Sequence, residues 1–134
     1  MSVSDNAEPI GSRLDPAILD EGIALLGGGV EGIAFLQDFA ATFEAELPGM
    51  LAELRERIDR QDITGASDLA HRIKQRARTL GLGYLQEAGH LLERDPLNEA
   101  AATVVDDFDV HASLALADLR SFFADRIAAW GADA

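Results

Sequence analysis

The sequence predicts an all-α protein, an antiparallel up-down four-helix bundle with a short additional N-terminal helix. Apolar residues recur at three- and four-residue steps over most of the chain, the spacing of one helix face. Glycine and proline interrupt this pattern at intervals, and no segment alternates as a β-strand does. Because the connections between the long amphipathic segments are short, we expect neighbouring helices to run antiparallel.

The chain begins with a tail and a short helix. Residues 1–13 are polar and uneven, and we expect a flexible N-terminal tail. Asp15 followed by Pro16 is typical of a helix start, since aspartate caps the free N–H groups and proline fits the first helical position. The glycines at 27–29 end that helix, because consecutive glycines favour turns. Residues 14–131 are then expected to form one helical-bundle domain.

Four longer helices are expected after the glycines. The apolar stripe over 30–58 predicts one long helix kinked near Pro48, or two nearly continuous helices, because proline removes a backbone donor. The remaining helices are expected at about 65–80, 84–94 and 98–130, the last either continuous or broken near 106–109.

The amino-acid composition excludes several classes of function. The chain has 134 residues and a formal net charge of -13, which argues against nucleic acid as a partner. It has no cysteine, so disulfides and thiolate metal sites are excluded. No apolar run approaches the roughly 20 residues of a membrane span, and no signal peptide is visible. We expect a cytoplasmic, monomeric protein without a membrane partner.

The stretch from Ala70 to Glu93 gathers basic residues around His71 in this acidic chain. On a helical wheel of about 100° per residue, His71 falls about 160° from Ile73, which lies at the centre of an apolar face. The imidazole is therefore expected to be exposed, where it can act as a nucleophile or proton carrier. Its side of the helix also carries Lys74, Gln75 and Arg78, with Asp68 at its edge.

Lys74 lies three residues after His71 and is therefore its neighbour on a helix surface. Its ammonium would stabilise a phosphoryl group on an imidazole nitrogen as a point charge. Asp68, three residues before His71, could orient the ring. The simpler alternative for Lys74 and the arginines is a solvated basic face.

The motif around His71 resembles that of histidine-containing phosphotransfer (HPt) domains of bacterial multistep phosphorelays. The family motif reads roughly A-H-x-x-K-G-x-x-x-x-L-G, followed by a helix ending in L-E. Here it stands as AHRIKQ from Ala70, then Leu80-Gly81, then Leu91-Leu92-Glu93. The resemblance extends over about 14–126, most of the chain.

This resemblance implies a phosphoryl carrier rather than a self-contained enzyme. Members are four-helix bundles that carry a phosphoryl group on an exposed histidine and exchange it with the aspartate of receiver domains. Carried over, His71 is the phosphoacceptor and Lys74 the cation beside it. The implied partners are response-regulator receiver domains and a hybrid histidine kinase in two-component signalling. No cofactor or metal of its own is implied, since the receiver supplies the acidic pocket and Mg²⁺.

One departure from the family motif affects the expected activity. Gln75 stands where the family usually has glycine, and Arg76 stands where a small residue is common. A side chain at 75 could narrow access, select a receiver or slow transfer. Asp68, Arg72, Gln75 and Arg78 are the expected partner-binding residues, and the arginines with Lys74 and Arg76 could steer an acidic pocket toward the histidine.

Two alternatives stay open. The chain could be an HPt-like binding module that docks receiver or kinase partners with weak or no transfer because of Gln75. It could also be a histidine-kinase-like dimerisation bundle, but the ATP-binding domain that this needs is not in the sequence. The other histidines are expected to be structural, His90 at the bundle edge and His111 on a solvated face.

Overall fold

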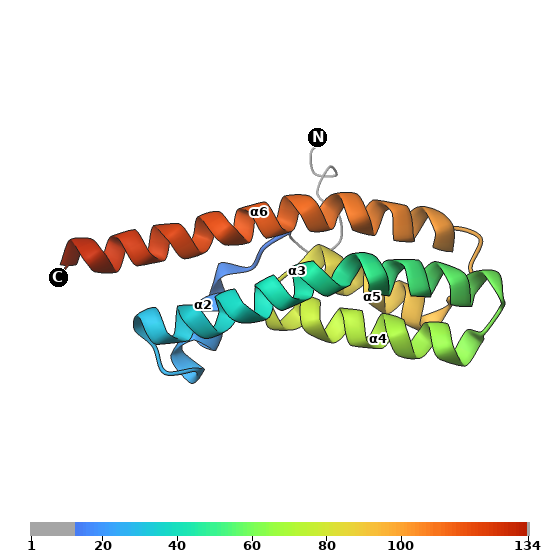
Figure 1. Ribbon diagram of the computed structural model, residues 1–134, viewed down its shortest axis with the longest axis horizontal. Helices are drawn as coiled ribbons and strands as arrows, with labels where there is room; N and C mark the ends of the chain where they lie inside the picture. The colour runs from blue at the N-terminus through green and yellow to red at the C-terminus, as the bar shows by residue number, and fades with distance from the viewer. Residues whose placement is uncertain (1–12, 134) are drawn as a thin grey trace, which may run out of the picture.

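The computed structural model describes residues 13–133, and within that part it contains five helices and no strand (Figure 1). The predicted all-α class is confirmed. The predicted tail at 1–13 lies outside the described residues except for Arg13. The helices are α2 Pro16–Leu25, α3 Gly29–Asp59, α4 Ile63–Thr79, α5 Gly83–Arg94 and α6 Ala101–Asp133.

Four long helices form the bundle, and α2 lies at one end of it. Figure 1 shows α3 and α4 running in opposite directions, as do α5 and α6. Helix α4 packs against both α3 and α5, while α6 packs against α3 and α5 from the other side. The short connections predicted from the glycines and prolines thus bring sequence neighbours together.

The turn after α4 is tied to the start of α2. Asp15 caps α2 by accepting a hydrogen bond from the Ala17 N–H at 3.1 Å, and Pro16 occupies the first turn. The Asp15 N–H donates to the Gly81 carbonyl at 2.8 Å. Gly81 has φ +67°, and a Cβ there would lie 3.0 Å from the Asp15 carbonyl oxygen, so glycine suits this position. This contact anchors the short helix to the bundle.

Two long helices continue through residues that interrupt the sequence pattern. Helix α3 is one helix across Pro48, and Leu47 and Leu51 on either side of it are buried. Helix α6 is continuous through 106–109, so the alternative of a break there is wrong. The burial of Phe108 within that acidic stretch explains the continuity, because core packing outweighs weak local preference.

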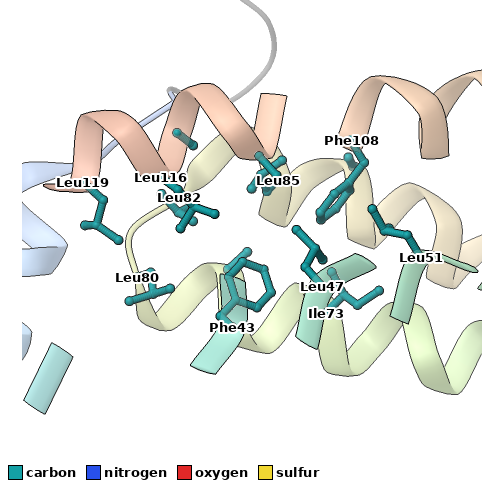
Figure 2. Packing of buried hydrophobic residues seen from close by; sticks show 14 of the residues in the cluster. Phe43, Leu47, Leu51, Ile73, Leu80, Leu82, Leu85, Phe108, Leu116 and Leu119 are labelled. Carbon is teal, nitrogen blue, oxygen red and sulfur yellow. The ribbon is translucent and has the colours of Figure 1, made fainter. Parts of the chain in front are cut away.

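The core is built from one face of each long helix. Figure 2 shows Phe43 and Leu47 of α3, Ile73 of α4, Leu85 of α5 and Phe108 of α6 packed together. Each such side chain contributes about 1.5–3 kcal/mol by leaving water. On α4 the buried residues are those of the predicted apolar face, namely Ala66, Leu69, Ala70, Ile73 and Ala77.

Candidate functional site

His71 lies on the outer side of α4, as the helical wheel predicts. Its side chain is 48% exposed, whereas Ala70 and Ile73 are buried. The register of this helix is fixed at its start, where Asp62 accepts a hydrogen bond from the Gly65 N–H at 3.0 Å. The buried stripe and the N-cap together direct the imidazole to solvent.

Glu93, in the last turn of α5, contacts both His71 and Lys74. Its Oε2 lies 3.0 Å from His71 Nδ1, and its Oε1 lies 2.6 Å from Lys74 Nζ. We call these three residues the α4–α5 cluster. An ionised carboxylate only accepts hydrogen bonds, so Nδ1 carries a proton and donates it to Glu93. In the neutral ring, Nε2 then holds the free lone pair.

Lys74 is more covered than its place on the wheel indicates. It was expected to share the exposed side, but its side chain is 17% exposed because α5 lies against it. A Cβ at Gly89 of α5 would lie 3.0 Å from Lys74 Cβ and 3.2 Å from its Cα, so a glycine permits this close approach. The two helices therefore meet at Lys74, and its ammonium is confined beside Glu93.

The same close approach positions Glu93. It follows Gly89 by four residues, so its side chain leaves the same side of α5 one turn later. Its carbonyl accepts a hydrogen bond from Ser67 Oγ of α4 at 2.8 Å. Backbone packing and a hydrogen bond across the helices thus place the carboxylate over the outer edge of α4.

Glu93 is held in its charged form. The hydrogen bond from Lys74 holds the pKa of the Glu93 carboxyl below its ordinary value; partial burial acts in the opposite direction, and the hydrogen bond from His71 lowers it further. The carboxylate is therefore ionised at neutral pH. It is 26% exposed, so solvent screens its contacts with Lys74 and His71 only in part.

The role expected of Asp68 is filled by Glu93 instead. Asp68 is exposed on α4, and its side chain makes no hydrogen bond or ion pair with another described residue. Glu93 comes from a different helix, and a wheel of α4 alone cannot show a residue of α5. The L-E pair that ends the motif helix was the available signal, and its contact with His71 was missed.

Gln75 contacts the other nitrogen of the imidazole. Its amide Nε2 lies 3.4 Å from His71 Nε2, one helical turn along the exposed side of α4. Both ring nitrogens therefore have a polar neighbour: Glu93 at Nδ1 and Gln75 at Nε2.

Unpaired positive charge gathers beside the α4–α5 cluster. The chain has 11 lysines and arginines, all in the described part, and eight of them form ion pairs there. Arg76, expected in the free basic group, is among the eight because it pairs with an acid of α3. Arg72 and Arg78 on α4 and Arg94 on α5 are exposed and unpaired among the described residues. Within residues 13–133, the arginines without an ion pair thus belong to the two helices of the site.

The other histidines lie outside the cluster. His90 is partly buried on α5, consistent with a place at the bundle edge. His111 was expected on a solvated face, but it is partly buried, and its ring centroid lies 4.2 Å from that of Tyr84. Packing of α6 on α5 brings these two rings together, which a pattern within one helix does not show.

Residues 13–133 contain neither a metal-binding cluster nor a single membrane-spanning helix. No group of three or more His, Cys, Asp or Glu side chains there could hold a metal ion. Within the same range, no single helix is long and apolar enough to cross a membrane. Helices α2 and α3, which are bent by 112° relative to each other, reach that length and apolar composition only when they are taken together.

Comparison with known proteins identifies the family. A family model described as the Hpt domain matches residues 38–122, which is more than half of the chain and includes α4 and α5. No curated protein and no solved structure matches the chain. Hpt domains transfer phosphoryl groups on histidine in phosphorelays and act as carriers rather than classical enzymes. The chain therefore belongs to the Hpt domain family.

Proposed function

We propose that this protein is a phosphorelay intermediate that carries a phosphoryl group on Nε2 of His71. The group is exchanged with the aspartate of receiver domains in two-component signalling. The observation that carries this proposal is the exposed imidazole whose Nδ1–H is held by Glu93, in a chain of the Hpt family. Residues 14–131 are proposed as the functional unit.

The proposed transfer accounts for every bond and electron pair without a cofactor on this chain. The Nε2 lone pair of His71 attacks the phosphorus of an aspartyl phosphate, a P–N bond forms, and the P–O bond breaks with its electron pair going to the aspartate carboxylate. Nδ1 keeps its proton, so the ring gains positive charge. The ionised Glu93 carboxylate, 3.0 Å from Nδ1, stabilises that charge. The reverse step returns the group to a receiver.

Lys74 is proposed as the cation beside the phosphoryl group. It follows His71 by three residues on one helix and is held by Glu93 at 2.6 Å. Its ammonium acts as a point charge on the phosphoryl oxygens. Mg²⁺ is expected on the receiver, so the carrier contributes mainly position and local charge.

The partner surface is proposed around the free arginines. Arg72 and Arg78 would attract the acidic pocket of a receiver domain, with Asp68 and Gln75 at the edge of the contact. Such steering raises the association rate and weakens with salt. A hybrid histidine kinase is the proposed source of the phosphoryl group. The monomeric state and the cytoplasmic location stay predictions.

A second function has one observation in its favour. The Gln75 amide lies 3.4 Å from His71 Nε2, the nitrogen that must attack. A binding module that docks receiver or kinase partners with weak or no transfer would be consistent with that contact. Tight receiver binding without transfer would favour this alternative, and rapid transfer would reject it.

The test is a panel of phosphorylated receiver domains from the same genome, followed at short times. Label on the wild-type chain is expected to be acid-labile and alkali-stable, as a phosphohistidine is. His71→Gln should abolish it. His90→Gln, the same change at a partly buried histidine of α5, should retain it. Label that persists unchanged in His71→Gln would reject the proposed phosphoacceptor.

A further inference from the structure

We propose that Gln75 is a positioning residue that occupies the lone pair of His71 Nε2 in the unphosphorylated protein. Phosphoryl uptake then requires this hydrogen bond to break. The inference deepens the proposed function and rests on it for the choice of Nε2 as the attacking atom.

The direction of the hydrogen bond between Gln75 and Nε2 follows from the protonation of Nδ1, the other ring nitrogen. Glu93 accepts the proton of Nδ1 at 3.0 Å, so the neutral ring has an acceptor at Nε2. The amide nitrogen of Gln75, which only donates, lies 3.4 Å from that acceptor. Gln75 and His71 are four residues apart on α4, the spacing at which helix side chains meet. Two side chains from two helices thus favour the same tautomer.

The contact has opposite consequences for the ring and for the reaction. It fixes the tautomer that leaves a lone pair at Nε2, but it also places a donor on that lone pair. An attack on phosphorus uses the same lone pair, so the amide and the phosphoryl group compete for it. A hydrogen bond of ordinary net strength would slow uptake by about two- to tenfold.

Two substitutions at Gln75 distinguish loss of the N–H donor from loss of side-chain bulk. Gln75→Met keeps the length of the side chain and lacks the N–H donor, whereas Gln75→Ala removes both. Gln37→Met is the matched control, since Gln37 is exposed on α3 and lies beside α6 rather than α4. A small phosphodonor, phosphoramidate, excludes any effect of receiver docking. The imidazole Nε2 attacks its phosphorus, and the donor's P–N bond breaks as ammonia leaves with the electron pair.

Both Gln75→Met and Gln75→Ala are expected to gain about two- to tenfold in the rate of His71 labelling by phosphoramidate, with Gln37→Met unchanged. A gain in Gln75→Ala alone would mean that the size of the side chain limits labelling, and it would overturn the inference that the hydrogen bond does. No gain in either variant would overturn it too.

Nitrogen NMR of His71 gives a readout that needs no transfer. The Nε2 resonance of the neutral ring should shift between wild type and Gln75→Met, because donation to the lone pair shields that nitrogen. Identical Nε2 shifts would overturn the inference. If receivers never label His71 while this shift is present, the proposed function fails and the role of Gln75 at the ring stands.

Discussion

Glu93 on α5 holds the imidazole of His71 on α4 through a 3.0 Å contact between Oε2 and Nδ1. The two residues are 22 positions apart in sequence, so the ring orientation depends on how the two helices pack. The other carboxylate oxygen lies 2.6 Å from Lys74 Nζ. One side chain therefore aligns the proposed nucleophile and the proposed cation.

Glu93→Gln tests this alignment. The amide keeps the shape but loses the charge that stabilises the phosphorylated ring, so transfer from a receiver should slow by about 10- to 100-fold, the equivalent of a charge-assisted hydrogen bond. Nitrogen NMR should show a smaller population of the Nδ1–H tautomer of His71, because a neutral amide is a weaker acceptor than a carboxylate, while receiver affinity stays near that of wild type. Glu87→Gln, the same change elsewhere on α5, should alter neither. Wild-type transfer with an unchanged tautomer in Glu93→Gln would contradict the assignment.

Gly89→Ala tests the close approach of the helices. The added Cβ would lie 3.0 Å from Lys74 Cβ and 3.3 Å from its backbone nitrogen, so α4 and α5 must separate there by a few tenths of an ångström. We expect a loss of about 1–3 kcal/mol in the free energy of unfolding, measured in urea, together with slower transfer because Glu93 moves with α5.

Gly49→Ala is the matched control for that variant. It lies within α3, and a Cβ there would meet nothing within 4 Å. Alanine in such a helix position should stabilise by about 0.5–1 kcal/mol, since glycine loses more backbone freedom on folding. Equal effects of the two substitutions would show that contact with Lys74 is unimportant.

The sequence predicted what depends on one helix and missed what depends on two. The apolar spacing in α4 was enough to place Ile73 inside and His71 outside. The contact from Glu93 and the covered position of Lys74 both require α5 to lie against α4. That packing is set by Gly89, whose effect is steric and acts across the interface.

Helix continuity was ambiguous in sequence for a related reason. The acidic stretch at 106–109 and Pro48 both weaken helices locally. In the bundle, Phe108 and Leu47 are buried beside them, and that burial is worth more than the local loss. The local sequence pattern therefore could not decide between a continuous and an interrupted helix at either place.

The pH dependence of stability should report the ion pair of Glu93 with Lys74. The pKa of Glu93 is lowered in the folded protein, so its contribution is complete above the ordinary pKa of 4.5 and is lost as pH falls through the lower folded value. The difference in free energy of unfolding between wild type and Glu93→Gln, measured in urea across a pH series, should shrink below pH 4.5. A difference that stays constant as the solution is acidified would contradict a lowered pKa.

Charge reversal tests the free arginines as the partner surface. The double change Arg72→Glu and Arg78→Glu should lower the association rate with a receiver by about tenfold at low salt, because it removes attraction and adds repulsion. The control, Arg60→Glu with Arg120→Glu, makes the same change in net charge at arginines that pair with acids of α3. Stopped-flow association at several salt concentrations should show a flatter salt dependence for the first double variant only. If the association rate falls equally in both double variants, overall charge rather than this surface steers the partner.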